Sequence, residues 1–237
     1  VVIHGSWPLI SWYIFSDSTN VYIRTLRVQA KVNLRNAQIS FSNINSSEFL
    51  SEIENSKMLN DTTIQGQQAY HAKVSFNSQS DEAIYGFGNW PDRETVGLPN
   101  LNQKNRTLDL CHGIYSENSK DAVPAFVSTK GYGVLFHTYS RIIKKPGLVF
   151  DIDWALNDAL DYFVMYGPEI DSVISQLRYL TGKSTMFPKS ALGFWSSRNK
   201  YISQASILAA ATEFRVLNIP IDYIVQDYYW WTSGGSF

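Results

Sequence analysis

Apolar and polar residues alternate along much of the chain between residues 21 and 166, with the period of two that half-buried β-strands show. The clearest stretches are Val28–Leu34, Ala72–Phe76 and Leu148–Trp154. The run Ser128-Thr129-Lys130-Gly131 separates two apolar runs, and its glycine suits the positive φ of a tight hairpin turn. Many short antiparallel strands with one solvated face predict a β-sandwich. The Ser-, Asn- and Glu-rich stretch 42–68 is expected to be a loop region.

The pattern changes to a helical period after Gly167-Pro168. An apolar stripe predicts a first helix that ends at Gly182; it consists of Ile170, Val173, Ile174, Leu177 and Leu180. Ser203 suits the N-cap of a second helix, which Pro220 ends. Two short apolar strands, Ala191–Trp195 and Asp222–Asp227, flank this helix and predict a β-α-β unit.

Composition excludes several classes of function. With 20 basic and 21 acidic residues the net charge is −1, so we expect neither a nucleic-acid partner nor a membrane partner. No run approaches the roughly 18 apolar residues of a membrane span. The single cysteine, Cys111, excludes an internal disulfide framework and reads as a small buried apolar residue. The four histidines show no metal-ligand spacing with it, so neither a metal nor a cofactor is expected.

Candidate chemistry gathers at the end of the second strand. Ligands of parallel α/β units meet the carboxyl ends of the strands, which here are Phe194–Arg198 and Gln226–Trp231. A carboxylate such as Asp227 accepts hydrogen bonds from sugar hydroxyls, and an aromatic ring covers the apolar C–H face of a sugar. Alternatively, the aromatic residues only pack under neighbouring helices. A lone β-α-β unit leaves strand edges uncovered, so this chain is expected to be the front part of something larger.

Several linked motifs resemble glycoside hydrolase family 31. In the carboxyl-terminal part they are Asp161-Tyr162-Phe163-Val164-Met165-Tyr166-Gly167-Pro168, Leu180-Thr181-Gly182-Lys183, Phe187-Pro188-Lys189-Ser190-Ala191-Leu192-Gly193-Phe194-Trp195-Ser196-Ser197-Arg198 and Ile219-Pro220-Ile221-Asp222-Tyr223-Ile224-Val225-Gln226-Asp227. Upstream they are Ile84-Tyr85-Gly86-Phe87-Gly88, Pro124-Ala125-Phe126-Val127-Ser128 and Gly131-Tyr132-Gly133-Val134. The resemblance covers most of the chain.

The resemblance implies a mainly β fold: an antiparallel, galactose-mutarotase-like β-sandwich followed by the first two β/α units of a (β/α)8 barrel. We expect the sandwich over residues 1–166, a connecting helix and linker over 167–187, and the start of the catalytic barrel over 188–237. Family members are retaining, exo-acting α-glycosidases, with some lyases and transglycosylases. Their nucleophile and acid/base aspartates lie on barrel strands four and six, so no catalytic residue is expected in this chain, which needs the missing remainder of the barrel as its partner.

The resemblance also implies a substrate site for an oligosaccharide or α-glycoside. The residues expected to bind substrate are Asp227, Tyr229, Trp195, Arg198 and Trp230 from the barrel, and Asp109 from a sandwich loop between about 89 and 121. Asp92 and Asp121 are weaker candidates for that loop, and Asp109 can also be read as an exposed acid. Tyr229 stands where family α-glucosidases carry the second aspartate of Asp-x-Asp and α-xylosidases carry an aromatic residue. This favours α-xylosides, with an α-glucosidase or transglucosylase as the alternative.

The remaining acids are expected to have other roles. Asp151 and Asp153 share one face of a strand and are expected to be solvated, and Asp222 is expected to be structural. The sequons at Asn45, Asn60 and Asn105 permit glycosylation and a secreted or extracellular location. A hypothesis of another class is a non-catalytic carbohydrate-binding or scaffold protein.

Overall fold

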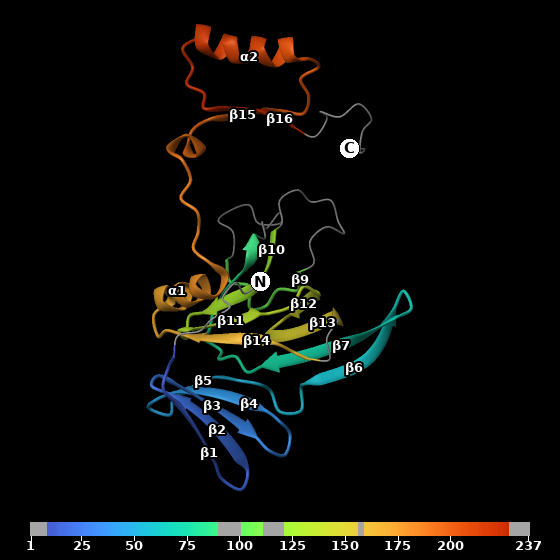
Figure 1. The fold of residues 1–237 in the computed structure, drawn as a ribbon, viewed down its shortest axis with the longest axis vertical. Coiled ribbons are helices and arrows are strands. Elements are labelled where there is room, and N and C mark those ends of the chain that lie inside the picture. The colour runs from blue at the N-terminus through green and yellow to red at the C-terminus, as the bar shows by residue number, and fades with distance from the viewer. Residues whose placement is uncertain (1–8, 90–100, 111–120, 156–158, 228–237) are drawn as a thin grey trace. The chain divides into compact units, whose positions relative to one another are not determined.

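A computed structural model describes residues 9–89, 101–110, 121–155 and 159–227 of the 237-residue chain. The chain divides into two compact units, Val1–Lys183 and Ser184–Phe237. In its described residues the first unit has antiparallel strands and one α-helix, whereas the second has a parallel strand pair and one α-helix (Figure 1). The division falls inside the segment expected to connect the domains, and the first helix lies in the first unit.

Three antiparallel sheets make up the described part of the first unit (Figure 1). The amino-terminal sheet has the order β1-β2-β3-β4-β5, formed by Trp12–Ser16, Asn20–Thr25, Val28–Asn33, Ile39–Asn43 and Glu48–Ser51. The second has the order β6-β7-β13-β12-β9, formed by Met58–Ile64, Gln67–Phe76, Leu148–Ala155, Arg141–Lys145 and Leu108–Asp109. The third has the order β14-β11-β10-β8, formed by Tyr162–Tyr166, Tyr132–Phe136, Asp121–Ser128 and Ile84–Asn89.

The period-two stretches are strands, as predicted. The predicted hairpin is the β10–β11 pair, in which Ser128 pairs with Tyr132 and Gly131 has a φ of 77°. The expectation of a loop over 42–68 was wrong, because this stretch contains β5 and β6. β6 pairs with β7 along its whole length but leaves most of its side chains exposed. A strand held by its backbone at a sheet edge needs no apolar alternation, so the pattern did not reveal it.

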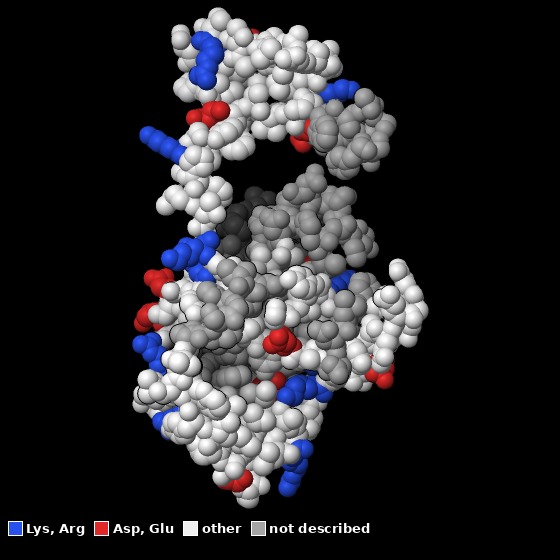
Figure 2. Space-filling view, in the orientation of Figure 1, with Lys and Arg blue, Asp and Glu red and all other residues white. Residues whose placement is uncertain are grey.

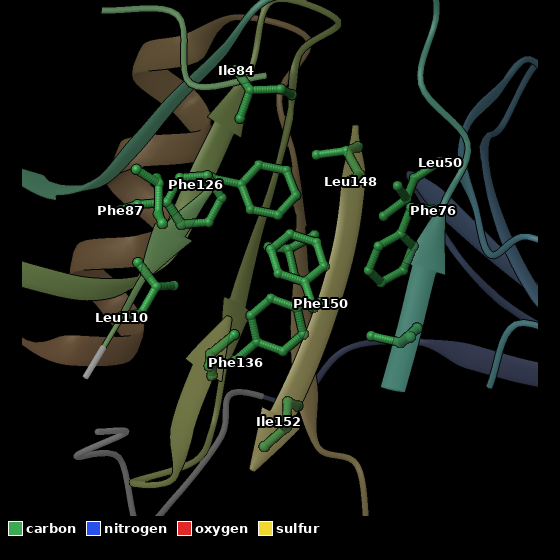
Figure 3. Packing of buried hydrophobic residues seen from close by; sticks show 14 of the residues in the cluster. Leu50, Phe76, Ile84, Phe87, Leu110, Phe126, Phe136, Leu148, Phe150 and Ile152 are labelled. Carbon is green, nitrogen blue, oxygen red and sulfur yellow. The ribbon is translucent and has the colours of Figure 1, made fainter. Parts of the chain in front are cut away.

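The core lies between the second and third sheets, and Phe150 of β13 is at its centre (Figure 3). The Phe150 ring is 4.7 Å from Phe136, 5.8 Å from Phe126 and 6.0 Å from Phe87, all on the facing sheet. Phe76 of the neighbouring strand contacts it edge-on at 6.2 Å. Aromatic rings from both inner faces interdigitate, which is the packing of a β-sandwich.

Helix α1, Ile170–Thr181, covers the outer face of the third sheet. Its buried Val173 and Leu180 pack on Leu135 and Met165. The contact is close at Gly133 of β11, where an added Cβ would lie 2.7 Å from Val173 Cγ1. Of the apolar stripe predicted from sequence, Val173, Leu177 and Leu180 pack on the sandwich, whereas Ile170 and Ile174 are exposed.

The second unit contains a 3-10 turn at Lys189–Leu192, β15 at Trp195–Arg198, α2 at Gln204–Val216 and β16 at Tyr223–Gln226 (Figure 1). Ser203 caps α2, as predicted: its Oγ accepts from Ser206 N, and Ser206 Oγ accepts from Ser203 N. The expectation of a strand over Ala191–Trp195 was wrong, because β15 begins only at Trp195. In the turn before β15, Gly193 N donates to Ser190 O, so these two backbone groups bond within the turn and not to a neighbouring strand.

Charges of both signs are dispersed over the face seen in Figure 2, in agreement with the near-zero net charge. In the described residues, no helix is both long and apolar enough to cross a membrane. Nor do three or more His, Cys, Asp or Glu side chains of that part of the chain gather as ligands for a metal ion.

Candidate substrate site at the carboxyl ends of two parallel strands

The two strands of the second unit are parallel and in register. Trp195 pairs with Tyr223 and Arg198 pairs with Gln226. Backbone bonds extend the pair beyond both ends, since Tyr223 N donates to Phe194 O at 3.2 Å and Asp227 N to Arg198 O at 3.3 Å. The main chain therefore brings Arg198 and Asp227 together at the carboxyl edge, although they are far apart in sequence.

The two faces of this strand pair differ in what they contact. Phe194 meets Phe214 of α2 edge-on, with ring centroids 5.9 Å apart. The face of the strand pair that carries Phe194 therefore lies toward the helix. Trp195 faces the opposite way and stacks on Tyr223 at 4.1 Å with an interplanar angle of 23°. Because side chains alternate along a strand, Asp227 falls on the Trp195–Tyr223 face. An aromatic pair and a carboxylate thus share one face of the sheet.

Arg198 and Gln226 share the other face and hold the loop after β15. The Arg198 guanidinium lies over the Tyr201 ring, 5.8 Å from its centroid. Gln226 Oε1 accepts a hydrogen bond from Tyr201 N at 3.0 Å. The sequence did not single out Gln226 or Tyr201 for this role. The available signal was the side-chain amide of Gln226 at the end of a strand. Its partner, Tyr201 N, is identified only by the fold.

Trp195 begins β15 rather than ending it. At about 3.3 Å per residue, three residues separate it from Arg198 by roughly 10 Å along the strand. Its indole Nε1 donates to Ala191 O at 3.1 Å, and its side chain is 49% exposed. Among the other candidates, Tyr229 and Trp230 lie outside the described residues.

Asp109 lies in the first unit, on the two-residue strand β9. Arg141 of the adjacent β12 donates to it through Nε at 3.1 Å and through Nη2 at 2.5 Å. Arg141 Nη1 is also 3.7 Å from Asp153, which pairs with His71 Nδ1 at 3.0 Å. Asp109 is therefore a member of a charged cross-strand cluster, and its substrate role stays a prediction. Of the weaker candidates for the same loop, Asp121 begins β10 and Asp92 lies outside the described residues.

The expectation of solvated acids on β13 was wrong. Asp151 is only 7% exposed and forms an ion pair with Lys145, and Asp153 has the partners given above. Their partners come from neighbouring strands, which the alternation in one strand does not reveal. Asp222 is structural, as expected, because its Oδ2 accepts from Phe194 N at 3.0 Å and so positions the start of β15.

The three sequon asparagines, Asn45, Asn60 and Asn105, are exposed. Asn45 follows β4, Asn60 lies in the edge strand β6, and Asn105 lies in the loop before β9. Their side chains are thus accessible to a modifying enzyme as far as the described residues show.

An antiparallel sandwich followed by a parallel β-α-β unit defines a protein that joins a sandwich domain to the start of an α/β barrel. Residues 2–143 match the model of the glycosyl hydrolase 31 N-terminal galactose mutarotase-like domain, and residues 184–237 match that of the glycosyl hydrolases family 31 TIM-barrel domain. The chain belongs to glycoside hydrolase family 31, whose members are glycoside hydrolases. This confirms the family and the fold class inferred from the sequence.

Two α-xylosidases are similar to this chain in sequence. The chain is 32% identical over 167 residues to an α-xylosidase of Saccharolobus solfataricus, covering 70% of this chain and 23% of the relative. It is 28% identical to α-xylosidase A of Aspergillus niger, covering 71% of this chain and 22% of that protein. The chain thus spans less than a quarter of the length of these two relatives.

Solved structures show the same fold. A family 31 α-xylosidase from a soil metagenome, complexed with xylose, superposes with a TM-score of 0.80 at 25% identity, covering 99% of this chain and 36% of that one. The family 31 α-xylosidase of Xanthomonas citri gives a TM-score of 0.74 at 18% identity, covering 93% of this chain and 40% of that one.

Proposed function

We propose that this chain forms the amino-terminal part of a retaining, exo-acting α-glycosidase that prefers terminal α-xylosides. The observation that carries the proposal is the position of Asp227, which directly follows β16 and whose backbone N donates to Arg198 O at the carboxyl end of the strand pair. A carboxylate at this strand end suits a sugar because it accepts hydrogen bonds from sugar hydroxyls, and the aromatic residues Tyr229 and Trp230 follow it closely in the sequence. The α-xylosidases among the relatives support the choice of sugar.

In this proposal each residue has a separate role. Asp227 accepts hydrogen bonds from sugar hydroxyls, and Tyr229 and Trp230 shape the pocket that selects the sugar. Arg198 positions the loop after β15 through its contact with Tyr201. Asp109 contributes from the sandwich side, with Arg141 fixing the orientation of its carboxylate.

The proposed reaction follows the retaining route. One carboxylate attacks the anomeric carbon while a second, roughly 5–5.5 Å away, protonates the leaving oxygen. Water, deprotonated by the second carboxylate, then attacks the anomeric carbon, the bond to the first carboxylate breaks, and the sugar is released with its anomeric configuration kept. Neither carboxylate is assigned to a residue of this chain, since we expect both from barrel strands beyond β16.

The first test compares kcat/KM of the full-length enzyme on an aryl α-xyloside before and after Asp227→Asn. A hydrogen bond to a charged group contributes about 1.5–3 kcal/mol, so kcat/KM should fall about 10- to 100-fold. Asp171→Asn on the exposed side of α1 is the matched control and should leave the value unchanged. Equal activity of both variants would remove Asp227 from the site.

The second test addresses the choice of sugar and the stereochemistry. Tyr229→Asp should shift the ratio of kcat/KM values from the aryl α-xyloside toward the aryl α-glucoside, because it restores an acceptor for a sugar hydroxyl. A wild-type preference for glucoside that the variant leaves unaltered would favour an α-glucosidase, as in the relative from Bacillus thermoamyloliquefaciens. Release of the β-anomer first, followed by NMR, would contradict the retaining route.

We also propose a secreted or extracellular location, which the exposed sequon asparagines support. The protein produced in its own host should lose mass when treated with an N-glycosidase. An unchanged mass at Asn45, Asn60 and Asn105 would remove this support.

A further inference from the structure

One face of the amino-terminal sheet is polar across all of its inner strands. Cross-strand partners share a face, and the register aligns Asn20 with Asn33, Lys31 with Ser40, and Ser40 with Ser51. The opposite face carries apolar residues such as Phe41 and Leu50, and these pack on the sandwich core. The polar face is therefore directed away from the core.

This polar face contains a pocket of about 210 Å³ in the first unit. Its lining includes Asn20, Lys31, Asn33, Ser40, Glu48 and Asn77. Asn20, Lys31 and Asn33 are half-buried and Ser40 is only 8% exposed, whereas Glu48 and Asn77 are exposed. Amide, hydroxyl, ammonium and carboxylate groups thus line one concave surface and are not spread over a flat one.

The polar groups of the pocket retain hydrogen-bonding capacity. Within the described part of the chain, neither the Lys31 ammonium nor the Glu48 carboxylate has a hydrogen bond or ion pair, although both side chains line the same pocket. Asn77 uses one amide hydrogen on Ser51 Oγ at 3.0 Å, which leaves a second donor and its carbonyl oxygen. The pocket therefore offers both donors and acceptors, from the Lys31 ammonium, the Glu48 carboxylate and the remaining amide groups of Asn77.

An aromatic stack runs beside the pocket on the same face. Phe15 of β1 stacks on Tyr22 of β2 at 4.7 Å and 6°, and Tyr13 continues the stack at 5.8 Å. Lys31 is the register partner of Tyr22, so the ring face that Phe15 leaves uncovered lies on the side of the pocket. Asp17 Oδ2 accepts from the Tyr22 hydroxyl at 2.9 Å and fixes the ring.

We propose that this polar face, centred on Lys31, Asn33 and Glu48, is a binding site for a neutral oligosaccharide. Sugar hydroxyls both donate and accept, which matches the presence of donors and acceptors in one pocket, and the Tyr22 ring offers an apolar surface to the sugar C–H groups. The carboxylate of Glu48 balances the ammonium of Lys31, which disfavours a polyanion. The site is separate from the strand ends proposed to bind substrate, and it does not depend on the proposed activity.

The test is a residue-resolved NMR titration of the 237-residue chain with a xyloglucan heptasaccharide. Amide signals of residues 20–24, 29–33 and 38–42 should shift together and saturate. Lys31→Ala should weaken binding about tenfold, the expected loss for a hydrogen bond to a charged group. Lys73→Ala is the matched control, because Lys73 is a half-buried lysine on β7 of another sheet.

Three results would overturn the proposal: no saturable shifts on this face, equal affinity of Lys31→Ala and wild type, or saturable shifts with inorganic phosphate but not with the sugar. Shifts confined to residues near Asp227 would support the proposed substrate site and reject this one. Conversely, sugar binding on the polar face by a protein without glycosidase activity would leave this inference standing.

Discussion

Glu52 is a buried carboxylate that joins parts of all three sheets of the first unit. It is 1% exposed and follows β5, and its backbone forms a bridge with Phe76 of β7. Its Oε2 accepts from Ile39 N of β4 at 2.7 Å, and its Oε1 accepts from the Tyr162 hydroxyl of β14 at 2.8 Å. Lys57 Nζ lies 2.9 Å from Oε2. We predict that Glu52→Ala loosens the attachment of the amino-terminal sheet.

The expected loss of stability follows from the groups left behind. Removing the carboxylate leaves a backbone N–H and a tyrosine hydroxyl without their acceptor, at about 1–3 kcal/mol for each buried group. The Lys57 side chain is 31% exposed and can turn to water, so its ion pair adds at most about 1 kcal/mol. Together these give about 2–7 kcal/mol, which includes the roughly 3–5 kcal/mol found when one partner of a buried pair is removed. That is a large fraction of the roughly 5–15 kcal/mol of a typical domain.

Urea unfolding followed by circular dichroism and by tryptophan fluorescence measures this loss. Lys57→Ala should cost at most about 1 kcal/mol, and Tyr162→Phe about 1–2 kcal/mol. In the double variant Glu52→Ala/Tyr162→Phe the two losses of stability should not add. Glu52→Ala leaves the Tyr162 hydroxyl without its acceptor, and Tyr162→Phe removes that hydroxyl. A loss below about 1 kcal/mol for Glu52→Ala, or full additivity, would refute the view of Glu52 as a joint between sheets.

Two further predictions concern the loop before β9 and the start of β15. Lys144 is fully buried and donates to the carbonyls of Gln103 and Lys104 at 2.6 Å, while burial lowers the pKa of its ammonium to about 8. Between pH 8 and about 10.4 the unfolded chain therefore binds more protons than the folded chain, so the folded wild type becomes more stable as the pH rises. The urea midpoint of wild type minus that of Lys144→Met should increase across this range. A constant or decreasing difference would contradict this. Gly193→Ala would place Cβ 1.9 Å from Asp222 Oδ2 and should destabilise the second unit by about 1–3 kcal/mol, measured by hydrogen exchange of β15 amides; unchanged exchange would show that the loop absorbs the clash.

Local patterns identified the parts of the fold whose information is local. A period of two marked β3, β7 and β13 because one face of each packs inward while the other faces polar surroundings. The helical stripe of α1 and the serine cap of α2 were recognised because helix signals lie within a few residues. Linked motifs identified the family, since their order and spacing persist where overall identity is low.

Other features have partners that lie far away along the chain. The edge strand β6 has no apolar face that could be recognised in the sequence, and its backbone pairing with β7 holds it in place. The start of β15 depends on Asp222, which follows α2 in the sequence and accepts a hydrogen bond from Phe194 N. Nothing in the local sequence distinguishes Asp151 from a solvated acid, whereas in the fold it is buried and paired with Lys145 of the neighbouring strand.

The sequence by itself determined the sandwich, the β-α-β unit and the family, and it placed Asp227 at a strand end, because strand and helix periods and strand ends are local properties. Only the tertiary structure decided which groups meet: Asp109 with Arg141, Gln226 with Tyr201, and Lys31 and Glu48 around one pocket. The physical reason is that a hydrogen bond or ion pair forms over a few ångströms of space. Sheet register, which is fixed by packing of the whole core, sets those distances.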